Sequence, residues 1–95
     1  MYFLLIYDLI DDYIDKRKPH RKAHFDHIMG FREKGEFIMG GAYQNEKQAA
    51  LVFKTKNQEV VENFVKNDPY FLNGLVTEFA IEPWNVVITE SEILV

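Results

Sequence analysis

The segment that most constrains the fold is residues 2–7, YFLLIY, in which every side chain is aliphatic or aromatic. Such residues favour extended backbone, so the segment predicts a β-strand. A strand of an antiparallel sheet with one wet face alternates between apolar and polar residues, and this segment does not alternate. We therefore expect both faces of this strand to be covered.

The remaining chain predicts two helices and three further strands. The first helix is expected from Pro19 to about Lys34, because proline suits the first turn and Gly35 can supply a left-handed cap. The second begins after Thr55 or Asn57 as its cap and ends before Pro69. The strands are expected at 36–43, 48–54 and 75–82, the last ended by Pro83, with a loop at 8–15 and a turn at 70–74.

The predicted order is βαββαβ, which is typical of the ferredoxin-like α+β fold with a four-stranded antiparallel sheet. Right-handed crossovers place both helices on one face of that sheet. The other face is then bare, although the first strand is apolar on both sides. We expect a second copy of the chain to cover it, which predicts a homodimer through the open sheet face.

Length and charge limit the classes of function. Ninety-five residues predict a single domain, with a core of about 1–84 and a C-terminal extension of about 85–95. The net charge of −4 argues against nucleic acid and anionic membranes as partners. The chain has no cysteine, which excludes disulfides and thiolate catalysis. Its start shows no basic leader or membrane-length apolar run, so a cytoplasmic location is expected.

All three histidines lie in or beside the first helix. At about 100° per residue, His20, His24 and His27 fall within roughly 60° of one helix face. Histidines spaced three or four residues apart can share a metal ion. However, Asp26 points to nearly the opposite side of the helix, and no other ligand is evident. We expect a half-exposed histidine stripe at the edge of the core, with no metal and no cofactor.

Several short motifs together resemble those of a known family. They are Arg21-x-x-His24, Gly35 after the helix, Gly40-Gly41, Asp68-Pro69-Tyr70 and Gly74-Leu75-Val76. In this order and spacing, over about residues 1–84, the chain resembles the YCII-related (YciI-like) family. One position departs from the pattern: the second strand commonly ends in Gly-Pro, whereas this chain has Gly41-Ala42. Because of that difference, the resemblance does not determine the shape of the pocket rim, and it does not determine the substrate.

The resemblance implies a dimeric α+β barrel of ferredoxin-like subunits with a His–Asp general acid/base pair in a pocket. Carried over by position, the pair is His24 and Asp68, with Arg21 and Tyr70 as neighbouring candidates for substrate binding. Family members are similar in fold to muconolactone isomerases, and some are linked to elimination reactions on products of aromatic-ring breakdown.

The residue types of this pair are themselves suited to acid/base chemistry. The two predicted helices lie side by side in a ferredoxin-like subunit, so a hydrogen bond between His24 and Asp68 is possible. A carboxylate bonded to one imidazole nitrogen fixes the tautomer and leaves the other nitrogen for proton transfer. The alternative is that His24 is structural and that Asp68 only caps the turn at Pro69.

The other candidates also have simpler interpretations. Arg21 can hold a substrate carboxylate with two hydrogen bonds, or it can pair with an acidic residue of the 8–15 loop. Tyr70 can offer a hydroxyl to the pocket or pack in the core. Tyr7, at the end of the first strand, is a further candidate at the pocket mouth.

Two functions from different classes follow. The first is a lyase or isomerase that needs no cofactor and uses His24 and Asp68 on a small carboxylated or phenolic metabolite. The second is a binding or sensing dimer that holds a similar molecule without converting it. A purely structural dimer is the third interpretation.

Overall fold

The computed structural model describes residues 1–94; residue 95, the end of the expected extension, lies outside the described residues. The strands are β1 (Tyr2–Leu9), β2 (Phe37–Tyr43), β3 (Gln48–Lys54) and β4 (Val76–Trp84). The helices are α1 (Tyr13–Lys16), the 3-10 helix η1 (Lys18–His20), α2 (Arg21–Glu33), α3 (Gln58–Asn67) and α4 (Pro69–Leu72). The strands form one antiparallel sheet in the order β2-β3-β1-β4, which confirms the ferredoxin-like α+β fold.

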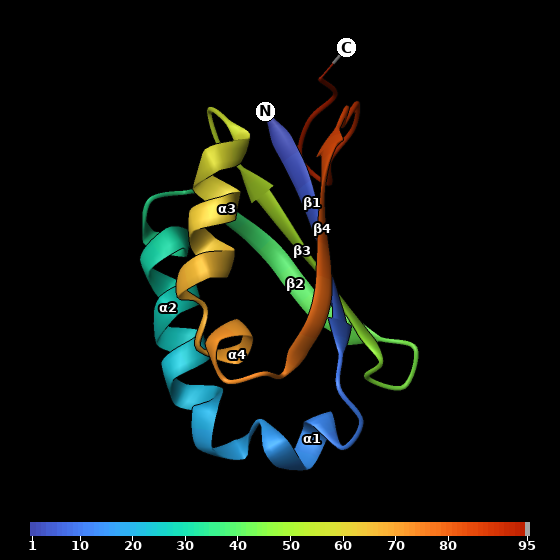
Figure 1. Ribbon diagram of the computed structural model, residues 1–95. Helices are drawn as coiled ribbons and strands as arrows, with labels where there is room; N and C mark the ends of the chain where they lie inside the picture. Colours follow the sequence, from blue (N-terminus) through green and yellow to red (C-terminus); the bar gives the residue numbers. More distant parts are fainter. Residues whose placement is uncertain (95) are drawn as a thin grey trace.

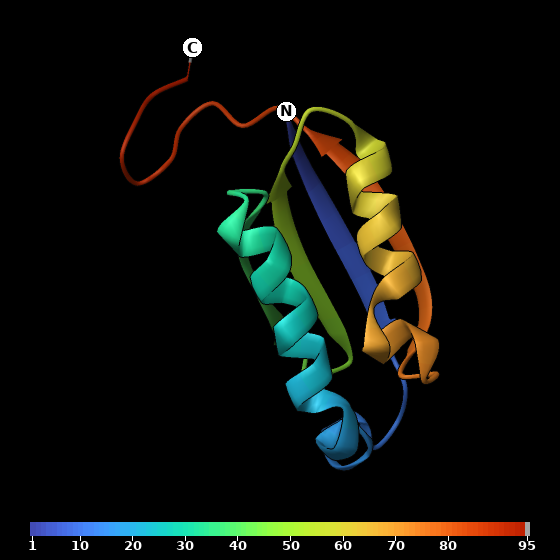
Figure 2. The same cartoon turned by 90° about the vertical axis from the view of Figure 1, so that its left-hand side faces the viewer.

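The molecule has two layers. The long helices α2 and α3 lie on the same face of the sheet (Figure 1), side by side in the view turned by 90° (Figure 2). None of the helices within residues 1–94 is long and apolar enough to cross a membrane.

Strand β1 divides its side chains between the two faces of the sheet. Phe3, Leu5 and Tyr7 are buried against the helices. Leu4 and Ile6 point to the opposite face, where they are half-buried and pair with residues of β3 and β4. No described helix covers that face (Figure 1), and a second copy of the chain is still the predicted cover for it.

Helix α3 begins and ends as the sequence indicates. The Asn57 side chain accepts a hydrogen bond from the backbone N–H of Val60 at 3.3 Å and caps the first turn. Phe64 is fully buried and meets Phe53 of β3, with ring centroids 4.9 Å apart. Gly35 has φ of 75°, the left-handed conformation expected of it at the end of α2.

Three local predictions are wrong. Residues 8–15, which were expected to form a loop, instead complete β1 up to Leu9 and then enter the one-turn helix α1. The expected turn at 70–74 begins as another one-turn helix, α4. Pro83 does not end the last strand but lies inside it, paired with Phe3. Because β4 is an edge strand, its outward side needs no N–H donor, so proline is tolerated there.

Candidate functional site

Asp68 lies between α3 and α4, and the sequence places it there for a local reason. Because the residue before a proline avoids helical geometry, Asp68 is extended, with φ of −71° and ψ of 119°. Its side chain then caps α4, since the backbone N–H of Tyr70 donates to Oδ1 at 3.0 Å. Asp68 is thus a helix cap, and the cap fixes where its carboxylate lies.

The same carboxylate joins α2 and β1. Nδ1 of His24, the one buried residue of α2, lies 2.6 Å from Oδ1 of Asp68. The hydroxyl of Tyr7 donates to Oδ2 at 2.7 Å. Asp68 is fully buried, so these contacts and the Tyr70 N–H replace the water that the carboxylate has lost.

This network determines which nitrogen of His24 is free. An ionised carboxylate only accepts hydrogen bonds, so Nδ1 of His24 must carry the proton that it shares with Asp68. Burial, and then the Asp68 charge, raise the pKa of the Tyr7 hydroxyl, which therefore stays protonated as a donor. Nε2 is left as the nitrogen of His24 that can take up or release a proton.

Tyr70 holds the imidazole from one side. Its ring lies parallel to that of His24, with centroids 3.6 Å apart and planes within 5°. The hydroxyl of Tyr70 is buried and has no hydrogen-bond partner among residues 1–94. Burial raises its pKa, the adjacent Tyr13 adds to this effect, and the adjacent Arg21 guanidinium partly offsets it.

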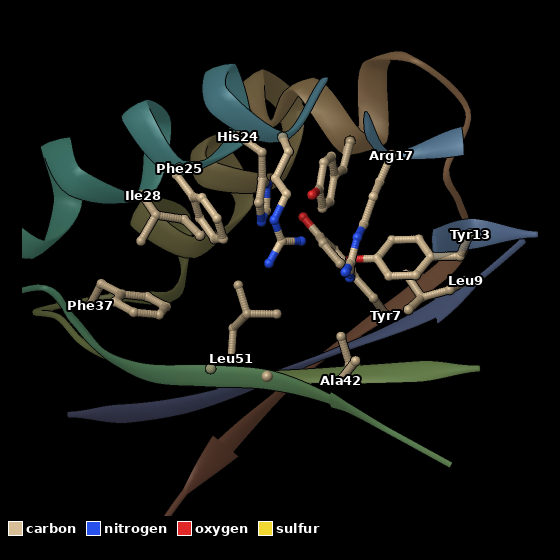
Figure 3. Close-up of a pocket in the computed structure, with 15 residues that line it drawn as sticks. Tyr7, Leu9, Tyr13, Arg17, His24, Phe25, Ile28, Phe37, Ala42 and Leu51 are labelled. Carbon is tan, nitrogen blue, oxygen red and sulfur yellow. The ribbon is translucent and has the colours of Figure 1, made fainter. Parts of the chain in front are cut away.

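His24 opens onto a cavity of about 280 Å³ between the helix layer and the sheet (Figure 3). Tyr7, Tyr70 and His24 line one side, and Phe25, Ile28, Phe37 and Leu51 form an apolar part. Three residues of β2 also line the cavity: Gly40, Gly41 and Ala42. The Gly41-Ala42 pair, which stands where the family commonly has Gly-Pro, therefore lies in the cavity wall. Asp68 is not on the surface of the cavity; it lies behind His24.

The structure brings all five predicted site residues together. His24, Tyr7, Tyr70 and Arg21 line the cavity, and Asp68 is hydrogen-bonded to three of them, His24, Tyr7 and the backbone of Tyr70. The surroundings of Tyr7 differ from those expected, because its hydroxyl is already bonded to Asp68. No ion pair of Arg21 with an acidic residue is present within residues 1–94. Its guanidinium lies over the Phe25 ring, 4.6 Å from the centroid.

The other two histidines point elsewhere. Nε2 of His27 lies 2.9 Å from the backbone oxygen of Phe64, and its ring packs on that of Phe64. His20 is half-buried and does not line the cavity. In the part of the chain that the structure describes, no group of three or more His, Cys, Asp and Glu side chains is placed to hold a metal ion.

Sequence reasoning missed Arg17 and Tyr13. Both line the cavity: Tyr13 begins α1, inside the segment expected to be a loop, and Arg17 lies between α1 and η1. Figure 3 shows their side chains directed into the cavity next to Tyr7. The four-residue spacing from Tyr13 to Arg17 was the available signal, since residues spaced in this way lie on the same side of a helical turn.

Comparison with known proteins gives the family of the chain. The model of the YCII-related domain matches residues 1–85. The chain belongs to the YCII-related family. All five predicted site residues lie within the matched range, whereas residues 86–94 follow it.

One solved structure gives the fold independent support. It is the 5-chloro-2-hydroxyhydroquinone dehydrochlorinase (TftG) of Burkholderia phenoliruptrix AC1100, in complex with 2,5-dihydroxybenzoquinone. The alignment covers 90% of this chain and 94% of that chain, with a TM-score of 0.76 and 21% sequence identity. At this identity the likeness concerns the fold. A search of curated protein sequences gave no significant match.

Proposed function

We propose that this YCII-related protein is an acid/base enzyme, a lyase or isomerase that acts on a small carboxylated or phenolic molecule without a cofactor. The observation that supports it best is the bond between Asp68 and Nδ1 of His24, at 2.6 Å, beside a cavity. Since Nδ1 is occupied, Nε2 is available to a bound molecule. Asp68 and Tyr7 are positioning residues, and Arg21 and Tyr70 bind the substrate.

The proposed reaction starts with proton removal. Nε2 of His24 takes a proton from a carbon next to a carbonyl, and the electron pair of that C–H bond moves into the carbon framework. In an elimination, this pair forms a carbon–carbon double bond while the bond from carbon to the leaving group breaks. The leaving group takes the electron pair of that bond, and the imidazolium gives its proton to solvent. In an isomerisation, the imidazolium returns the proton to another carbon. A positioned base of this kind contributes about 10²–10⁴-fold to a rate.

The name of the similar structure agrees with this reaction class. A dehydrochlorinase removes a proton and a chloride from one molecule, and that protein binds 2,5-dihydroxybenzoquinone, a small oxygenated ring. We extend to this chain the type of reaction, and not the particular substrate.

We further propose that the protein works as a homodimer. The open face of the sheet carries Leu4, Ile6 and Val52, all half-buried in a single chain, and the exposed Trp84 at its edge. Packing two such faces together would remove these side chains from water. The dimer is expected to form through this face and not through the helices.

Hydrogen exchange tests the catalytic proposal without knowledge of the product. The protein is incubated in D₂O with chlorinated hydroquinones, unsaturated carboxylated lactones and 2,5-dihydroxybenzoquinone, and carbon-bound hydrogens are followed by NMR. We expect exchange or loss of chloride with at least one compound, slowed at least about 100-fold in His24→Gln. His20→Gln is the matched control, since His20 does not line the cavity.

Two results would count against the proposal. If His24→Gln exchanges hydrogen as fast as the wild type, His24 is not the base. If compounds bind in the cavity but none exchanges hydrogen, the binding or sensing function is the better account.

A further inference from the structure

Two arginines face the cavity and have no negative partner within residues 1–94. Arg17 and Arg21 both line it, and no residue that lines it is acidic. Within residues 1–94, neither arginine has an Asp or Glu oxygen within 4.0 Å. The chain as a whole has a net charge of −4, so this cavity concentrates positive charge in an acidic protein.

Aromatic rings hold both guanidinium groups. Cζ of Arg17 lies 5.1 Å from the centroid of Tyr13, and that of Arg21 lies 4.6 Å from the centroid of Phe25. Such stacking fixes the plane of a guanidinium and leaves its N–H groups free to donate. The two side chains are therefore oriented but not neutralised.

The Tyr70 hydroxyl lies in the same cluster. Tyr70 packs edge-to-face on Tyr13, with centroids 5.8 Å apart, and Arg21 is close enough to affect the pKa of its hydroxyl. The residue is only 2% exposed, yet this hydroxyl has no hydrogen-bond partner among the described residues. A buried hydroxyl without a well-formed hydrogen bond costs free energy. Arg21 and Tyr13 are its polar neighbours, so a carboxylate bound by Arg21 would lie beside it.

We propose that Arg17 and Arg21, beside the Tyr70 hydroxyl, form a receptor for a carboxylate, so that the cavity binds its substrate as an anion. The apolar part of the cavity, including Ile28, Phe37 and Leu51, receives the remainder of the molecule. The substrate class is then a small aromatic or unsaturated carboxylic acid. This inference rests on the proposed function, because it takes the cavity beside His24 as the active site.

In this arrangement Arg17 distinguishes a carboxylate from an uncharged group of the same shape. This preference can be measured as binding, without turnover. NMR titration of ¹⁵N-labelled protein compares 4-hydroxybenzoate with 4-hydroxybenzamide, which have the same shape but differ in charge. We expect the acid to bind at least about tenfold more tightly than the amide. Arg17→Gln should weaken binding of the acid at least about tenfold, the usual effect of removing one charge-assisted hydrogen bond.

Two further variants isolate the role of Arg17. Arg17→Lys keeps the charge but loses the planar fork, so the acid should bind with intermediate affinity. Arg32→Gln is the matched control, because Arg32 is exposed at the other end of α2 and does not line the cavity. It should bind the acid as the wild type does.

Three results would overturn the inference. The amide binds as tightly as the acid; Arg17→Gln behaves like Arg32→Gln; or inorganic phosphate displaces the acid at equal concentration, which would indicate a general oxyanion site. The titration is repeated on His24→Gln, where binding of the acid should persist. Binding that depends on Arg17 in a protein that exchanges no hydrogen would refute the catalytic proposal alone, and exchange without any preference for the acid would refute this inference alone.

Discussion

The bond between Tyr7 and Asp68 can be tested by Tyr7→Phe, which removes one oxygen and leaves the ring in place. Tyr7 Oη donates to a fully buried carboxylate at 2.7 Å. A hydrogen bond to a charged group contributes about 1.5–3 kcal/mol, and its loss leaves Oδ2 of Asp68 buried with no donor among residues 1–94. We expect the free energy of unfolding to fall by about 2 kcal/mol. For a domain of this size, the melting temperature should fall by about 8–16 °C.

The measurement is urea denaturation followed by tryptophan fluorescence and circular dichroism. Tyr43→Phe is the matched control, because Tyr43 is exposed on β2 and its hydroxyl has no hydrogen bond among the described residues. The control should change the unfolding free energy by less than about 0.5 kcal/mol. If Tyr7→Phe is as stable as this control, the Tyr7 hydroxyl does not support the Asp68 carboxylate, and its assignment as a positioning residue is wrong.

Three further predictions concern pH, helix capping and assembly. Burial raises the pKa values of Tyr7 and Tyr70, so above about pH 10 the unfolded chain binds fewer protons than the folded one. Stability should therefore be intact below pH 10 and fall as the pH rises further, less steeply in Tyr7→Phe, as thermal melts at pH 9 to 11 would show. Asn57→Ala removes the cap of α3 and should cost about 1 kcal/mol in urea denaturation, whereas a cost near zero would show that the cap is dispensable. Ile6→Lys places a charge on the open sheet face and should convert a dimer to a monomer in sedimentation velocity; a wild-type protein that is monomeric at micromolar concentration would contradict the dimer.

The element order was predictable because long elements show their periodicity in the sequence. Helix α3 has apolar residues at helical spacing (Val60, Val61, Phe64 and Val65), a cap at Asn57 and an end before Pro69, which together are enough local information to predict a helix. The short helices were not predictable in this way. Helices α1 and α4 have four residues each, too few to form without tertiary contacts, so packing and not propensity places them.

The candidate site was predictable only in part. Resemblance to the family paired His24 with Asp68, and the capping preference of Asp before Pro69 gave the carboxylate a fixed place. The Tyr7 bond joins residues 61 positions apart, and the Tyr70 stacking depends on how two helices approach each other. Arg17 was missed because it stands in a run of basic residues, Lys16-Arg17-Lys18, and such a run usually faces water.

The central claim is that Nε2 of His24 is the proton-transfer nitrogen because Asp68 holds the proton on Nδ1. A long-range ¹H–¹⁵N spectrum of the histidine side chains measures the protonation of each ring nitrogen directly. We expect neutral His24 to show a protonated Nδ1 and a bare Nε2, and we expect this preference to be lost in Asp68→Asn. A spectrum with the proton on Nε2 in the wild type would contradict the account.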